Sequence, residues 1–398
     1  MCTQFPKTNR LCLTLTWALA SPAVTIAAEL TPLSFSYHTA RVLVPGDPAT
    51  VQHYLAFPAL LDLGHEVLVS YKRGKAHGGD AGASIDFVRV DKATRRTSSP
   101  RTIAAIDGKI MQMGEWVRYP NGDIANYIDA QQPGKPARIG MRGTRSTDGG
   151  ATFGPVETLG VVDGVEYGYP FGFAVEGATT WAMMMTFSNL KGGYSVYPAR
   201  VEAGQVCMLR SEDNGRTWKF VRNLSREFGD IPINESSFVR YDEGFLVATR
   251  GYDNRVRLHV TDAEFRVKKQ ATLTGNHGFI RSYVGRPRLF ARDGRYYLMG
   301  RNWTDSTTAA AVAKNDGGPN MPPAMKLCLF RLDPETVGVA AYAVLDNAEG
   351  DNVTDAYYPM PYFVAKEGKT YLRVIDYKGV DRRPPQIVEF EYLWNEVR

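Results

Sequence analysis

The sequence predicts an all-β protein, a six-bladed β-propeller built from four-stranded antiparallel blades. One pattern recurs six times along the chain: an apolar strand, a turn that contains glycine, and a second apolar strand. The turn glycines of successive copies lie 50 to 74 residues apart, a period typical of propeller repeats. No segment shows the pattern of a long amphipathic helix. A β-sandwich with long loops is the alternative fold.

Each of the six copies is expected to form a hairpin. Asn-Gly, Glu-Gly and Asp-Gly pairs close several of them, and such pairs favour tight β-turns. A further strand-like run follows each hairpin, for example at 84–90 and 256–261. The predicted hairpins span 57–74, 115–130, 169–187, 235–251, 286–303 and 358–377.

The N-terminal segment predicts export. Lys7 and Arg10 precede an apolar run that ends in small residues, the pattern of a secretory signal peptide. We therefore expect residues 1–28 to be removed and residues 29–398 to form the propeller domain. The mature protein would then be periplasmic or extracellular, with no membrane span.

Composition excludes several classes of function. The net charge is only +5 and no dense basic tract occurs, so nucleic acid is not an expected partner. No Cys/His cluster has zinc spacing and no cofactor motif is present, so we expect no cofactor. The cysteines beyond the leader, Cys207 and Cys328, are expected to be two buried thiols rather than one disulfide. The expected state is a monomer.

Two segments share the pattern Ser-x-Asp-x-Gly-x-Thr-aromatic, at 146–153 and 211–218. The aspartate can cap its own turn, the glycine allows positive φ, and the aromatic ring can pack on the blade. The pattern resembles the Asp-box, or BNR repeat, of the sialidase (neuraminidase) superfamily. That resemblance implies a six-bladed catalytic propeller that acts on glycans.

The residues that begin the innermost strands of a propeller converge at one mouth of its channel. A tyrosine beside a glutamate can act there as a nucleophile, because the carboxylate takes the phenolic proton. Sialidases use such a tyrosine, and arginines suit the substrate carboxylate. The residues expected at this mouth are found by counting back from the turn glycines. They are Ala56, Met113, the segment 166–169 with Tyr167, Glu235, Arg286 and Tyr358.

Three patches are similar to catalytic motifs of bacterial sialidases. Glu235 lies fifteen residues before Arg250, with a strand, a turn and a strand between them. Tyr358 begins the last blade, with Tyr357 as the alternative nucleophile. The loop after the second strand of the first blade contains Asp80. The resemblance implies that Asp80 is the acid.

His77 lies in the same loop and competes with Asp80 for the role of acid. The chain also departs from the sialidase pattern at the substrate-binding arginines. Ala56 stands where the first-blade arginine is expected, and no arginine occurs at the place of the third. We expect Arg286 or Arg288 to compensate.

Lys72 and Arg73 are further candidates for substrate binding, because they add positive charge in the first blade. Two long segments, 189–204 and 307–324, could border the same cleft.

The sequence therefore predicts an exported, exo-acting glycoside hydrolase of sialidase type that removes a terminal, acidic sugar from a glycan. One alternative is a polysaccharide lyase, with His77, Tyr358 or His277 as the base that removes the proton α to a uronate carboxylate. Another is a glycan-binding propeller without catalytic activity.

Overall fold

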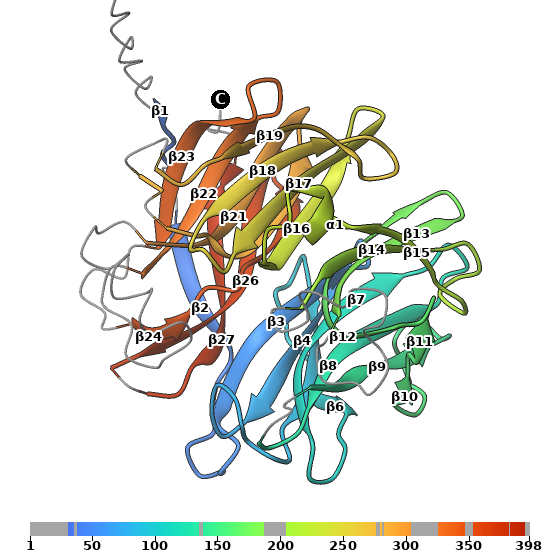
Figure 1. The fold of residues 1–398 in the computed structure, drawn as a ribbon. Helices are drawn as coiled ribbons and strands as arrows, with labels where there is room; N and C mark the ends of the chain where they lie inside the picture. Colours follow the sequence, from blue (N-terminus) through green and yellow to red (C-terminus); the bar gives the residue numbers. More distant parts are fainter. Residues whose placement is uncertain are drawn as a thin grey trace, which may run out of the picture.

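The fold is a ring of six antiparallel sheets around a central axis, with one short helix, α1 (Leu224–Glu227), in the described part of the chain. Figure 1 shows the sheets following one another in chain order around the molecule. The predicted six-bladed β-propeller is confirmed, and the sandwich alternative is wrong. The computed structural model describes residues 31–35, 38–134, 138–186, 204–275, 279–280, 282–303, 325–346, 353–381 and 383–394.

The first three blades follow the predicted hairpins, each running from an innermost strand outward. The short strand β11 (Val161–Val162) adds to the inner edge of the third blade. The strands of these blades are β3 (Tyr54–Asp62), β4 (Glu66–Gly74), β5 (Ser84–Asp91) and β6 (Arg101–Ala104); β7 (Ile110–Arg118), β8 (Ile124–Gln131), β9 (Arg138–Ser146) and β10 (Glu157–Thr158); β12 (Val165–Glu176), β13 (Thr179–Thr186), β14 (Val206–Ser211) and β15 (Lys219–Asn223).

The last three blades also keep the predicted hairpins. Asp293–Gly294 closes the fifth with positive φ at both residues, as a type I′ turn requires. The strands are β16 (Ile233–Tyr241), β17 (Gly244–Gly251), β18 (Val256–Thr261) and β19 (Val267–Thr272); β20 (Gly285–Arg292), β21 (Arg295–Trp303), β22 (Met325–Asp333) and β23 (Gly338–Asp346), with β1 (Thr31–Pro32) parallel to β23; β24 (Val353–Ala356), β25 (Met360–Lys366), β26 (Lys369–Val380) and β27 (Gln386–Leu393).

The outermost strand of the sixth blade comes from the start of the described chain. Strand β2 (His38–Val44) pairs antiparallel with β27, and Figure 1 shows the two side by side. The Arg41 Nε donates to Glu389 Oε2 at 2.7 Å across this pair. Arg95 of the first blade also donates to Glu389 and, at 3.1 Å, to Glu391. The two ends of the chain thus close the ring through strand pairing and buried charge.

Apolar clusters between neighbouring blades form the core. Leu68 and Phe87 of the first blade pack with Trp116 of the second. Tyr127 of the second blade packs edge-on against Trp218 of the third, with ring centroids 6.0 Å apart. Each sheet therefore buries a face against the next one, which fixes the innermost strands around the axis.

The innermost strands share an irregularity near their first residues. A shift in pairing register, typical of a β-bulge, occurs at this end of β3, β7, β12, β16, β20 and β24. Three non-glycine residues have positive φ in the same region: Phe57 (55°), Arg286 (42°) and Tyr357 (71°). Bulges and such strained residues concentrate at functional sites, where they redirect side chains.

The two Ser-x-Asp segments form matching turns between the third and fourth strands of their blades. Asp148 accepts from the backbone and hydroxyl of Thr152 at 2.8 and 2.5 Å. Asp213 accepts from Thr217 in the same way, at 2.9 and 2.6 Å. These hydrogen bonds lower the pKa of both carboxyl groups, to about 2 for Asp213. Each turn is thus held by hydrogen bonds of its own aspartate.

The ring closure predicts a large stability effect for Glu389→Gln. This buried carboxylate accepts from Arg41, Arg95 and Tyr362. Removing one partner of a buried ion pair leaves the other charge uncompensated, so the free energy of unfolding should fall by about 3–5 kcal/mol in urea titrations.

Asp381→Asn is the matched control, because its pair with Arg383 is exposed and should contribute less than about 1 kcal/mol. An equal fall in the free energy of unfolding of the two variants would contradict the claim that the ring closure at Glu389 stabilises the fold.

Candidate active site

The starts of the innermost strands bring a buried cluster of charged and aromatic side chains together. Glu235 is the third residue of β16, and Tyr358 lies between β24 and β25 in the sixth blade. Arg250 lies at the end of β17, next to its last residue, so the hairpin returns it beside Glu235. We call this end of the central channel the mouth.

Glu235 is almost completely buried, with 2% of its surface exposed. Its Oε1 accepts from the Tyr169 hydroxyl at 3.1 Å. Its Oε2 accepts from Arg250 Nη1 at 2.6 Å and from the backbone N–H of Arg286 at 3.0 Å. Burial alone would raise the pKa of Glu235, but the guanidinium groups of Arg250 and Arg286, with the nearby Tyr358 phenol, hold it well below its usual range. The carboxylate is therefore ionised at neutral pH.

Tyr358 is the phenol beside Glu235, and the two groups shift each other's pKa. Only 7% of its surface is exposed, and its backbone N–H donates to Asp376 Oδ1 at 2.7 Å. Burial and the negative charge of Glu235 raise the pKa of Tyr358 far above the usual value, although Arg301 and Arg250 oppose the shift. The phenol thus stays protonated beside an ionised carboxylate.

Arg301 is a mouth residue that the sequence analysis missed. Its guanidinium lies over the Tyr358 ring, 5.4 Å from the centroid. Its Nη1 donates to the Ala356 carbonyl at 3.2 Å. The sequence contained a signal for it: Arg301 follows Arg286 by fifteen residues, the spacing between Glu235 and Arg250 one blade earlier.

The first blade brings an aromatic ring to the mouth where an arginine was expected. Ala56 is fully buried, and the bulge that follows turns Phe57 inward at positive φ. The Phe57 ring contacts Tyr358 and Tyr377, with centroids 5.3 and 5.4 Å apart, and His77 at 4.9 Å. No guanidinium therefore enters the mouth from this strand.

His77 lies at the mouth together with a carboxylate that was not predicted, Asp355. The His77 Nδ1 is 2.7 Å from Asp355 Oδ2, and the His77 side chain is 37% exposed. Asp355 also accepts from Tyr377 at 2.8 Å and from the Tyr54 hydroxyl. Burial would raise the pKa of Asp355, but His77 and Arg301 lower it. An ionised carboxylate thus orients the imidazole and leaves Nε2 available.

Asp80 lies in the same loop as His77 but is engaged in a buried ion pair. Its Oδ1 accepts from Lys72 Nζ at 2.7 Å, and its Oδ2 accepts from the backbone of Lys75 and Ala76. Lys72 makes three more hydrogen bonds, one of them to the His77 carbonyl at 3.1 Å. Lys72 and Asp80 therefore shape the loop that presents His77, and the geometry does not favour Asp80 as the acid or Lys72 as a substrate ligand.

Arg286 and Arg288 are at the axis, but their side chains face another protein group. Both guanidinium groups donate to Glu115 Oε1 of β7, on the second blade. Arg286 is 1% exposed. The expectation that these arginines replace a missing substrate ligand is not supported, because a buried carboxylate already binds them.

Other protein groups engage the remaining substrate-binding candidates, Arg73 and Tyr167. Arg73 is held by Asp86 at 2.6 Å and by Gln52 at 2.9 Å. Tyr167 packs in the apolar cluster between the second and third blades. A register shift between Tyr167 and Tyr169 puts these side chains on opposite faces of β12, so Tyr169 reaches Glu235 instead.

Tyr357, the alternative nucleophile, faces away from Glu235. Its hydroxyl donates to Asp346 Oδ2 at 2.7 Å within the cluster between the last two blades. His277 and nearly all of the segments 189–204 and 307–324 lie outside the described residues, as does the predicted leader 1–28.

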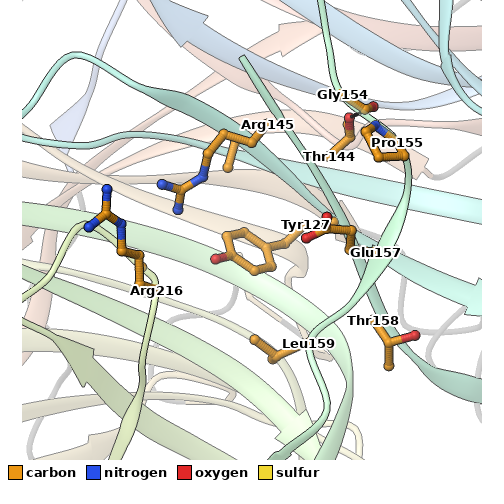
Figure 2. Close-up of a pocket in the computed structure, with 12 residues that line it drawn as sticks. Tyr127, Thr144, Arg145, Gly154, Pro155, Glu157, Thr158, Leu159 and Arg216 are labelled. Atoms are coloured by element: carbon orange, nitrogen blue, oxygen red, sulfur yellow. Dashed lines mark hydrogen bonds between the residues drawn. The ribbon is translucent and has the colours of Figure 1, made fainter. Parts of the chain in front are cut away.

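A separate hollow of about 450 Å³ lies on the outer part of the second blade. Figure 2 shows Arg145 and Arg216 beside the ring of Tyr127 at this hollow. Arg145 already donates to Asp123 at 3.1 Å and to the Asn214 carbonyl at 2.6 Å. Its charge therefore links two blades.

Among the described residues, no group of three or more His, Cys, Asp or Glu side chains could hold a metal ion. No helix in that same part of the chain is long and apolar enough to cross a membrane. Cys207 and Cys328 are buried free thiols, as expected.

Comparisons with solved structures show the shared fold. A protein of unknown function from Dyadobacter fermentans aligns with a TM-score of 0.64 and 14% identity, over 90% of this chain and 99% of the other. A Trypanosoma rangeli sialidase in complex with sialic acid aligns with a TM-score of 0.56 and 12% identity, over 92% of this chain and 60% of the sialidase. No family model and no curated protein sequence matches the chain.

The electrostatics of Glu235 predict how stability depends on pH. Because its folded-state pKa is depressed, Glu235 contributes stability above its unfolded pKa of about 4.3, and the contribution is lost as pH falls. Between pH 5 and 3 the free energy of unfolding of Glu235→Gln should fall less steeply than that of the wild type. The difference should reach at most about 1.4 kcal/mol per pH unit in urea titrations.

Glu243→Gln, on the exposed turn of the same hairpin, is the control and should keep the wild-type slope. A wild-type slope in Glu235→Gln as well would show that Glu235 is not an ionised, compensated carboxylate.

Proposed function

We propose that this protein is an exo-acting glycoside hydrolase of sialidase type, which removes a terminal acidic sugar from a glycan. The observation that carries the proposal is the buried Tyr358 phenol beside the Glu235 carboxylate, with Arg250 bound to Glu235 and Arg301 over the Tyr358 ring. The fold shared with a sialidase is consistent with this activity.

Tyr358 is the proposed nucleophile and Glu235 its base. The bond between the phenolic oxygen and the anomeric carbon forms as the glycosidic bond breaks, and the phenolic proton passes to Glu235. The raised pKa of Tyr358 and the lowered pKa of Glu235 keep the proton on the phenol before attack. A neutral nucleophile avoids repulsion by a carboxylate on the anomeric carbon.

Arg250 and Arg301 are the proposed ligands of that carboxylate. Both lie at the mouth beside the Tyr358–Glu235 pair, and guanidinium groups bind carboxylates through paired hydrogen bonds. Phe57 offers an apolar ring where the family has its first-blade arginine. We therefore propose a sugar with an anomeric carboxylate, either sialic acid or another ulosonic acid.

His77 is the proposed acid. Asp355 binds Nδ1, so Nε2 can give a proton to the leaving oxygen and later take one from the attacking water. In the second step water releases the sugar from Tyr358, and Glu235 returns the proton to the phenol. Of the two predicted acids, His77 fits better because Asp80 is bound to Lys72.

A lyase is the second candidate, favoured by the cluster of His77, Tyr54 and Arg301 around Asp355. An imidazole or phenol could remove a proton α to a uronate carboxylate while Arg301 offsets the developing charge. β-Elimination creates an unsaturated sugar that absorbs in the ultraviolet, whereas hydrolysis does not. A glycan-binding propeller without turnover is the third candidate.

We propose that the protein acts outside the cytoplasm, on the basis of the signal-like segment 1–28. Exported protein should have lost this segment, which N-terminal sequencing of the secreted form would test.

A substrate panel tests the proposed activity. The panel comprises sialosides, other ulosonic acid glycosides, uronate polymers and neutral aryl glycosides, with the wild type and Tyr358→Phe assayed together. Turnover is expected for a sugar with an anomeric carboxylate, and Tyr358→Phe should lower kcat by at least about 10³-fold because the nucleophile is lost.

Tyr362→Phe is the matched control, since that hydroxyl donates to Glu389 far from Glu235. Equal turnover by the wild type and Tyr358→Phe would exclude Tyr358 as the nucleophile. Release of an unsaturated product would favour the lyase.

The role of His77 predicts a dependence on the leaving group. His77→Asn should lower kcat/KM by about 10²–10⁴-fold for a natural glycoside, because a poor leaving group needs a proton. For an activated aryl glycoside, the kcat/KM of His77→Asn should fall much less. His53→Asn, at another part of the first blade, serves as the control. The same loss for both substrates in His77→Asn would contradict the role of acid.

A further inference from the structure

Glu115 connects the catalytic pair to the opposite side of the channel. It lies on β7 of the second blade and accepts from the side chains of Arg286 and Arg288 on β20 of the fifth. The second and fifth blades face each other across a six-bladed ring. All three side chains are buried, so this ionic contact spans the axis beneath the mouth.

The contact with Arg286 fixes one oxygen of Glu235. Arg286 precedes Pro287 and has φ of 42°, a conformation that an arginine adopts only under constraint. Its side chain is anchored to Glu115, and at 3.4 Å to the Pro170 carbonyl. In this conformation its backbone N–H points at Glu235 Oε2, 3.0 Å away.

The contact with Arg288 supports the other oxygen. Arg288 donates to Glu115 and, through Nη1, to the Phe171 carbonyl at 2.9 Å. Phe171 lies two residues from Tyr169, and the two rings touch with centroids 4.6 Å apart. Tyr169 donates to Glu235 Oε1. Each oxygen of Glu235 thus has a partner whose position depends on an arginine that Glu115 binds.

The charge of Glu115 also permits two guanidinium groups to lie together in a buried site. Burial and the neighbouring Arg286 lower the pKa of Arg288, and Glu115 opposes both effects. Without Glu115, two like charges would face each other close to the Tyr358 ring, which is 5.9 Å from the Arg286 guanidinium.

We propose that Glu115 is a positioning residue for the reaction, which acts across the channel through Arg286 and Arg288 to hold Glu235 against Tyr358. This assignment rests on the proposed function for its kinetic consequences. Glu115 touches neither the substrate nor the reacting atoms.

The test compares Glu115→Gln with Glu391→Gln. Glu391 is a matched control, because it is also a buried carboxylate that accepts from two arginines, Arg95 and Arg373, but lies on β27 away from Glu235. Both variants should lose stability. Only Glu115→Gln should lower kcat, by about 10²-fold as expected for a misplacement of about 1 Å, with KM changed by less than about threefold.

Crystal structures of the two variants provide a readout that needs no substrate. The Glu235 carboxylate should move away from Tyr358 in Glu115→Gln and stay in place in Glu391→Gln. An unmoved Glu235 in Glu115→Gln would overturn the proposal, whether or not the substrate panel finds an activity. An equal loss of kcat in both variants would overturn it too, because the effect would then be one of general stability.

Glu115→Asp covers the case in which Glu115→Gln does not fold. This variant keeps the charge but shortens the side chain by one carbon. The Glu235 carboxylate should therefore shift, and kcat should fall while KM stays unchanged. Wild-type kcat with an unmoved Glu235 in this variant would count against positioning.

Discussion

The ionised state of Glu235 is the constraint on which the mouth depends. A carboxylate with almost no contact with water is costly unless charges and hydrogen bonds surround it. Arg250 and the N–H of Arg286 bind one oxygen, and Tyr169 binds the other. These donors occupy both oxygens, so the phenolic proton of Tyr358 is the one that Glu235 would receive during a reaction. The arrangement that stabilises Glu235 therefore also suits the base that we propose for Tyr358.

Irregular backbone makes this arrangement possible. A regular innermost strand would alternate its side chains between the two faces of a blade and would aim none at the axis. The bulges near the first residues of these strands, with positive φ at Phe57, Arg286 and Tyr357, turn side chains into the channel. The same distortion separates Tyr357 from Tyr358, so that only Tyr358 meets Glu235. Local strain in the strands thus underlies the chemistry proposed for the mouth.

The repeat and its turns predicted the fold and the hairpin bounds well, because strand alternation and turn chemistry are local properties of the sequence. The meeting of Glu235 with Arg250 followed from hairpin geometry alone. Arg301 and Asp355 were missed, because they come from a neighbouring blade and from a short strand before Tyr358. Tyr169 lay in the segment 166–169 that was placed at the mouth, but Tyr167 was singled out, because the sequence does not show the bulge between the two. The sequence also did not show that Asp80 and Lys72, two predicted site residues, bind each other. Only the three-dimensional contacts reveal which charged groups already have protein partners.

The central claim is that Tyr358 attacks the anomeric carbon with Glu235 as its base. Its most direct test is covalent trapping with the 2,3-difluoro derivatives of N-acetylneuraminic acid and of 3-deoxy ulosonic acids. Fluoride leaves as the phenolic oxygen bonds to carbon, and the second fluorine slows hydrolysis of the adduct. Peptide mapping by mass spectrometry should find the sugar on Tyr358. An adduct on another residue, or turnover of the parent glycoside with no adduct on Tyr358, would contradict the account.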